Sequence, residues 1–298
     1  MVEIFKTEQR QYGDLNCKIY WLSTEKNGLI AVTRTVQPTA IKANIVFLPG
    51  MFSNRRFWLS DKGIGLASYL HKQGYECWMI DRRGLGESSK NDYKTANLHH
   101  CMEYDLPAVQ RLIENETQLA AFWFGHSFGG VVIAKSIALG KLDTDKIAGL
   151  VNFSSQLTVD KPFLNPPLSI LITVFTRTLG YFPSKKFKMG PENEAPDTMR
   201  DCVRLVSSAK TKKKPNFWSG FENVTAPVLS ICSEGDSVDP HPGCKELMDN
   251  MGSNDKTFAL HGKKHGHLQD YNHVSLVISK DAQKEIWPMI SNWLEKKL

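Results

Sequence analysis

Hydrophobic residues in this chain fall into short, mostly apolar runs that alternate with segments of helical periodicity. The short runs have the length of β-strands, and several lack any polar alternation, which is typical of inner strands covered on both faces. The segments between them carry apolar residues at helical spacing. The predicted strands are 17–22, 29–36, 44–48, 75–80, 119–124, 147–153, 227–233 and 256–260, and the predicted helices are 65–73, 104–115, 131–139 and 282–297. This alternation predicts an α/β protein with a mostly parallel sheet wrapped by helices on both faces.

One connection is much longer than a single crossover helix requires. Residues 156–223 contain the apolar piece 168–175, several prolines and the lysine clusters 185–188 and 210–214. We interpret this segment as a helical cap inserted over an active site. The expected organisation is a first core part at 1–155, the cap at 156–223 and a second core part at 224–298. The apolar piece is also compatible with a lid that touches a lipid surface, whereas we expect the lysines to be solvated.

Composition narrows the function classes. The 298 residues are 41% hydrophobic and 23% charged, with a formal net charge of +6, and the basic residues are mostly dispersed. We therefore expect no nucleic-acid partner, because no basic stripe with interleaved aromatic residues is present. The first residues lack a signal-peptide pattern, and no apolar run is long enough to span a bilayer. Six scattered cysteines without metal-ligand spacing favour buried free thiols, so we expect a reduced, cytoplasmic protein without a metal site.

The strongest chemical signal is the stretch LAAFWFGHSFGGVVI, residues 119–133. A predicted strand leads into Gly125-His126-Ser127-Phe128-Gly129, and a predicted helix follows directly. A strand, a G-x-S-x-G turn and a helix in this order form a nucleophile elbow, in which glycines allow a strained backbone and close approach of the neighbouring elements. This context predicts that Ser127 is a catalytic nucleophile. The alternative is a glycine-rich strand–helix junction of another doubly wound fold.

A nucleophilic serine needs a histidine base and a carboxylate that holds the histidine, in the chain order serine, acid, histidine. The loop after strand 227–233 reads SEGDSVDP, and within it Asp236 is the predicted acid, with Asp239 and Glu234 as alternatives. Four histidines follow the last strand: His261, His265, His267 and His273. We predict that His273 is the base because the residues after it lead directly into the terminal helix. His267, in a Gly-His pair, is the main alternative.

Catalysis by acyl transfer also needs backbone N–H groups that bind the developing oxyanion. Phe128, directly after the nucleophile, is one predicted donor. Met51 is the other, because Gly50 lets the chain turn after the apolar run NIVFL.

Together these residues resemble the α/β-hydrolase superfamily over nearly the whole chain outside the cap. The segments FLPGM, GYECWMIDRRGLGESS, YDLPAV and FGHSFGG are similar to its oxyanion loop, its pre-elbow strand and loop, its pre-elbow helix and its elbow. The closing segment YNHVSLVISKDAQKEIWPMISNWL resembles bacterial hydrolases related to acid lipases, which favours His273 as the base. One departure is Pro49, where the family usually has histidine. The resemblance implies an eight-stranded, mostly parallel sheet with a helical lid, and ester hydrolysis without a cofactor.

These observations predict a serine hydrolase that cleaves a hydrophobic carboxylic ester, with the apolar residues 168–175 of the cap near the acyl group. Thioester, lactone or peptide hydrolysis uses the same catalytic parts, and a non-catalytic binding protein on the same scaffold is a further alternative. Dehalogenation and epoxide opening are disfavoured, because those relatives have a carboxylate where this chain has Ser127. The expected partner is a small-molecule ester, and we expect no nucleic acid and no stable membrane insertion.

Overall fold

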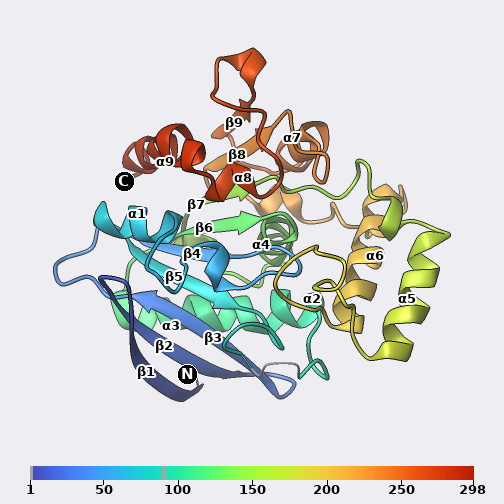
Figure 1. Ribbon diagram of the computed structural model, residues 1–298, viewed down its shortest axis with the longest axis horizontal. Helices are drawn as coiled ribbons and strands as arrows, with labels where there is room; N and C mark the ends of the chain where they lie inside the picture. The colour runs from blue at the N-terminus through green and yellow to red at the C-terminus, as the bar shows by residue number, and fades with distance from the viewer. Residues whose placement is uncertain (1–2, 89–91) are drawn as a thin grey trace.

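The computed structural model describes residues 3–88 and 92–298 (Figure 1). Met1 and Val2 lie outside the described residues, as does Ser89, the last residue of the segment GYECWMIDRRGLGESS. The strands are β1 (Glu3–Tyr12), β2 (Leu15–Thr24), β3 (Gly28–Thr35), β4 (Asn44–Leu48), β5 (Glu76–Asp81), β6 (Ala121–His126), β7 (Ile147–Phe153), β8 (Val228–Ser233) and β9 (Lys256–His261). The helices are α1 (Leu66–Lys72), α2 (Leu98–His100), α3 (Leu106–Thr117), α4 (Phe128–Ala138), α5 (Leu168–Leu179), α6 (Pro196–Lys210), α7 (His241–Asp249), α8 (Ser275–Ile278) and α9 (Lys280–Glu295).

All the strands of the described residues belong to one sheet, in the order β1-β2-β3-β5-β4-β6-β7-β8-β9. The pairings from β5 to β9 are parallel, and β1, β2 and β3 add antiparallel pairings at one edge. The described residues thus form nine strands, one more than the eight expected. The additional strand is β1, which the hydrophobic pattern did not indicate because most of its side chains are exposed at the sheet edge.

Alternate residues of the inner strands enter two separate hydrophobic cores, as the pleat of a β-strand requires. On β4, Val46 and Leu48 belong to the core that also contains residues of α3 and α4. Ile45 and Phe47 belong to the opposite core, with residues of α1 and α9. The sheet is therefore covered by helices on both faces, as the continuous apolar runs predict (Figure 1).

The long connection between β7 and β8, residues 154–227, is called here the inserted segment. It carries α5 and α6, which pack against each other at one end of the molecule (Figure 1). Across residues 3–88 and 92–298, every helix is too short or too polar to cross a bilayer.

Strand register brings several loops together at the carboxyl ends of the parallel strands. Leu48 at the end of β4 pairs with Gly125 of β6, and His126 of β6 pairs with Phe153 of β7. In the same way Phe153 pairs with Ile231 of β8. Ligands of open α/β sheets bind outside the carboxyl ends of the strands. The loops after β4, β6, β7 and β8 therefore leave the sheet side by side, where a site is expected.

Candidate active site

Ser127 lies in the tight turn between β6 and α4 and has φ 54° and ψ −129°. A positive φ is rare for a residue with a side chain and marks a strained turn. A Cβ atom on Gly125 would lie 2.3 Å from the Gly130 backbone, and one on Gly129 would lie 2.4 Å from the Leu48 carbonyl oxygen. Both glycines are therefore needed for the helix and the neighbouring strand to approach, which is the geometry of a nucleophile elbow.

The structure brings His273 together with Asp236. The Nδ1 atom of His273 lies 2.8 Å from Oδ2 of Asp236. The other carboxylate oxygen of Asp236 accepts hydrogen bonds of 2.9 Å from the backbone N–H groups of Val238 and Asp239. Burial alone would raise the pKa of Asp236, but its hydrogen bond and charge interaction with His273 outweigh burial and lower the pKa. Because the ionised carboxylate only accepts, Nδ1 of His273 donates, and a neutral His273 presents Nε2 as a base.

His126, the middle residue of Gly-His-Ser, supports the position of His273 and was not singled out from the sequence. Its Nε2 lies 2.9 Å from the backbone carbonyl oxygen of His273, and the two ring centroids are 4.4 Å apart. Burial, reinforced by the nearby His273, lowers the pKa of His126 to about 3. The ring is therefore neutral at pH 7 and can donate its Nε2 proton to that carbonyl, which ties the His273 loop to the elbow.

The hydroxyl of Ser127 donates to a second aspartate rather than to a histidine. Its Oγ lies 3.0 Å from Oδ2 of Asp239, and that oxygen is 3.9 Å from Nε2 of His273. Asp239 is completely buried. Its other oxygen, Oδ1, accepts hydrogen bonds from Lys161 and, at 3.0 Å, from Gln156, both in the inserted segment. Asp239, an alternative acid in the sequence, thus contacts Ser127, while Asp236 contacts His273.

The remaining sequence candidates lie in other surroundings. The ring of His267 lies tilted against that of His261, with centroids 4.3 Å apart, and its Nδ1 lies 3.3 Å from the Gly262 carbonyl oxygen. Glu234 pairs with Lys264 at 2.7 Å and with His265 at 3.0 Å. The structure does not place these groups in contact with Ser127 or Asp236.

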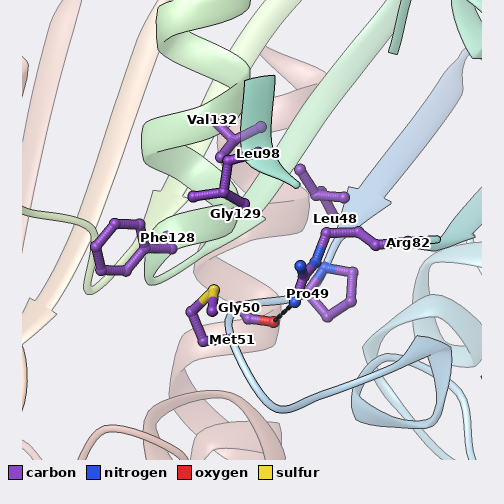
Figure 2. A pocket seen from close by; sticks show the side chains of 9 residues that line it. All are labelled: Leu48, Pro49, Gly50, Met51, Arg82, Leu98, Phe128, Gly129 and Val132. Atoms are coloured by element: carbon purple, nitrogen blue, oxygen red, sulfur yellow. Dashed lines mark hydrogen bonds between the residues drawn. The ribbon is translucent and has the colours of Figure 1, made fainter. Parts of the chain in front are cut away.

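The two predicted oxyanion donors line one small cavity. Met51 and Phe128 face it, with the side chains of Leu48, Leu98 and Val132 (Figure 2). The space between these residues is narrow and leaves no room for a water molecule. Within the described part of the chain, the N–H groups of Met51 and Phe128 donate to no backbone or side-chain acceptor. Gly50 lies against Ser127, since a Cβ on Gly50 would be 3.0 Å from Cβ of Ser127. Both N–H groups thus remain available beside Ser127.

A buried ion pair connects the inserted segment to the loop after β4, which carries Gly50 and Met51. Arg82 donates to Glu194 at 2.7 Å and to the Gly50 carbonyl oxygen at 3.4 Å, the bond drawn in Figure 2. Glu194 also accepts from the Phe52 N–H at 3.3 Å. Arg82 and Glu194 are both buried, so neither charge is compensated by bulk water. The position of Gly50 and Met51 therefore depends on residues that follow α5.

The comparisons with known proteins agree with this architecture. Residues 39–214, more than half of the chain, match the family model Hydrolase_4, described as serine aminopeptidase, S33. A search of the curated proteins found no significant match.

Similar solved structures cover nearly the whole chain. The monoacylglycerol lipase of Paleococcus ferrophilus has 18% identity and a TM-score of 0.63, covering 90% of this chain and 99% of that one. A soluble variant of monoglyceride lipase from Saccharomyces cerevisiae, in complex with a substrate analogue, has 15% identity and a TM-score of 0.69, covering 98% and 94%. A thermophilic esterase from Thermogutta terrifontis has 15% identity and a TM-score of 0.63, covering 94% and 98%.

At these identities the structures establish a shared fold, while the family model identifies the family. The predicted α/β-hydrolase fold is confirmed, with the antiparallel strand β1 as the addition to the expected sheet. The chain therefore belongs to the serine aminopeptidase S33 family of the α/β-hydrolase superfamily.

Proposed function

We propose that the protein is a serine hydrolase that cleaves carboxylic esters through Ser127, His273 and Asp236. The single observation that carries the proposal is the convergence at the elbow. Three features meet at the carboxyl ends of the parallel strands. They are a strained serine, a histidine held by an ionised aspartate and two available backbone N–H groups.

In the proposed reaction, Ser127 turns its hydroxyl from Asp239 to Nε2 of His273, which removes the proton as the oxygen attacks the ester carbonyl. The N–H groups of Met51 and Phe128 bind the oxyanion. His273, stabilised as an imidazolium by Asp236, then gives the proton to the departing alcohol. A water molecule activated by the same histidine cleaves the acyl-enzyme and regenerates the hydroxyl of Ser127.

The substrate that we propose has a hydrophobic acyl group. Leu48, Met51 and Val132 make the lining beside the elbow mostly apolar. Turnover of p-nitrophenyl esters of graded chain length, from acetate to palmitate, measures which acyl length is preferred. Equal turnover of the whole series would argue against recognition of the acyl group by apolar contacts.

A fluorophosphonate probe tests the nucleophile directly, since it labels only an activated serine. Wild type should be labelled and should turn over p-nitrophenyl esters, and Ser127→Ala should do neither. If wild type and Ser127→Ala are equally unlabelled and inactive, the chain is a binding protein on a hydrolase scaffold. Parallel assays with a thioester, a lactone and an aminoacyl p-nitroanilide distinguish ester cleavage from the other reactions of the same catalytic parts. The finer resemblance to acid-lipase-related bacterial hydrolases stays a prediction.

We also propose that the inserted segment, as a cap, contacts a lipid surface. Nine of the nineteen exposed large hydrophobic side chains of the described residues lie between Phe163 and Met189. The stretch 161–191 contains five lysines or arginines and no acidic residue. Apolar residues flanked by basic residues suit the surface of an anionic membrane. Flotation with phosphatidylserine-containing vesicles should recover the protein, whereas pure phosphatidylcholine vesicles should recover less.

A further inference from the structure

Asp239 has two oxygens in different surroundings, although the whole side chain is buried. Oδ1 is satisfied by Lys161 and Gln156. Oδ2 accepts a hydrogen bond only from the hydroxyl of Ser127 within the described part of the chain. Lys161 also donates to the Val238 carbonyl oxygen at 3.1 Å, which fixes its ammonium group on the Oδ1 side. The charge of Asp239 is thus balanced on one side, and its free hydrogen-bonding capacity faces the nucleophile.

Among the described residues, Ser127 is the only hydrogen-bond donor to Oδ2, and the proposed reaction removes this donor. When Ser127 gives its proton to His273, the hydrogen bond to Asp239 is lost. A buried acceptor left without a donor is expensive, and the cost corresponds to roughly a ten- to hundredfold lower rate. A substrate that brings its own donor to Oδ2 avoids this cost, while a substrate without one does not.

The position of Oδ2 indicates which part of the substrate meets it. In this mechanism Nε2 of the histidine protonates the leaving oxygen of the ester, so the leaving alcohol lies next to Nε2. Oδ2 is 3.9 Å from Nε2 of His273 and 3.0 Å from Oγ of Ser127. Asp239 therefore lies on the leaving-group side of the reaction centre, where a hydroxyl on the second carbon of the leaving alcohol would meet it.

From this geometry, and on the basis of the proposed ester hydrolysis, we propose that Asp239 recognises the leaving alcohol. The substrate class is an ester of a 1,2-diol, whose free hydroxyl donates to Oδ2 as Ser127 turns to His273. A neutral hydroxyl fits better than an ammonium group, because Lys161 already places a positive charge on this carboxylate. Asp239 is thus a specificity-determining residue, distinct from Asp236, which holds the base.

Two esters of matched size test the proposal in wild-type protein. In 2-hydroxyethyl butyrate and n-propyl butyrate, a hydroxyl and a methyl group occupy the same position. We expect kcat/KM for the hydroxyethyl ester to be at least about tenfold higher. Equal rates would overturn the assignment, since they would mean that a water molecule supplies the donor. If neither ester is cleaved, the proposed function itself fails.

The variant Asp239→Asn gives a sharper test. Lys161 needs an oxygen acceptor, so the amide oxygen of the new asparagine should face Lys161. Its NH₂ group then points toward the substrate. The variant should prefer 2-methoxyethyl butyrate, which only accepts hydrogen bonds, over 2-hydroxyethyl butyrate by a larger factor than wild type does. The matched control is Glu234→Gln, which neutralises a carboxylate of the same loop that pairs with Lys264. It should keep the wild-type ratio. The ratio of two rates in one preparation does not depend on the folded fraction. An unchanged ratio in Asp239→Asn would contradict the proposal.

Discussion

Helices α4 and α5 are both rich in apolar residues, but α4 buries its apolar side chains whereas α5 buries only polar ones. Every residue of α4 is buried, from Phe128 to Ala138. In α5 only Ser169 and Thr176 are buried, while apolar residues such as Leu171, 64% exposed, face outward. The hydroxyls of Thr173 and Thr176 bond to carbonyl oxygens of their own helix, at 2.7 and 2.8 Å, so the polar side of α5 needs no water.

The contrast shows that hydrophobicity alone does not tell which side of a helix packs on the protein. Helix α4 lies against the sheet and next to the residues that precede α3, so all its sides find partners. Helix α5 packs on α6 at the edge of the molecule with its short polar side chains. The apolar side chains of α4 are buried and stabilise the fold around the elbow, whereas most of those of α5 are exposed.

The largest effect is expected at the elbow that α4 supports. His273→Ala should lower kcat/KM by about 10³–10⁴-fold, because the proposed reaction uses His273 as the general base for Ser127. His267→Ala should stay within a few-fold of wild type, since His267 contacts neither Ser127 nor Asp236 in the structure. Steady-state kinetics on p-nitrophenyl butyrate measures both. Loss of activity in His267→Ala alone would reverse the assignment of the base.

Matched truncations test the difference in packing between the two helices. Ile133→Ala removes a completely buried side chain of α4 and should lower the free energy of unfolding by about 2–5 kcal/mol. Leu171→Ala in α5 should change it by less than about 0.5 kcal/mol. Urea denaturation followed by circular dichroism provides the comparison. Similar losses in the two variants would mean that α5 is buried in solution.

Lipid binding should depend on the exposed leucines of α5 and not on an exposed leucine elsewhere. Leu171→Ala should weaken partitioning into anionic vesicles by about tenfold, because a leucine side chain contributes about 1.5 kcal/mol or more on transfer from water. Leu119→Ala, an exposed leucine outside the inserted segment, should bind like wild type. High salt should weaken binding as well, because it screens Lys185, Lys186 and Lys188. Equal binding by both leucine variants would argue against docking through α5.

The smallest effect is expected from a change in pH, which alters the free energy of unfolding through two buried histidines. Burial lowers the pKa of His126 to about 3 and that of His261 to about 4, so both are neutral when folded and bind protons below about 6.5 when unfolded. Stability is therefore present above pH 6.5 and decreases as the pH falls, by about 1 kcal/mol per histidine between pH 7.5 and 5.5.

Asp81 acts in the opposite direction, because burial raises the pKa of its carboxyl to about 6. The histidine contribution is isolated by comparing wild type with His261→Gln in urea titrations at pH 7.5 and 5.5. The variant should lose less stability on acidification than wild type. An equal loss would show that His261 gains a proton in the folded state.

Much of the fold could be predicted because its signals are local. The run NIVFL coincides with β4, and 147–153 coincides with β7. The glycines around Ser127 predicted the elbow, since close approach of strand and helix leaves no room for side chains at Gly125 and Gly129. The outer strand β1 was not predicted, because an edge strand exposed to water has no apolar pattern to reveal it.

The candidate site was predicted in part. Motif order, the flanking residues and the resemblance of the closing segment pointed to Ser127, Asp236 and His273. The structure brings the last two into contact, although their catalytic roles stay proposals. The supporting role of His126 had no signal in the sequence. It depends on the approach of a loop that lies far along the chain, whose carbonyl oxygen accepts the hydrogen bond.

The sequence by itself determined the strands other than β1, the helices α1, α3, α4 and α9, and the elbow, because apolar periodicity and glycine positions act over a few neighbouring residues. Only the tertiary structure decided that Asp239 contacts Ser127 with Lys161 behind it, and that α5 turns its apolar side outward. Both outcomes depend on contacts between residues distant in the chain, where burial, and not the local pattern, determines which polar groups must find partners.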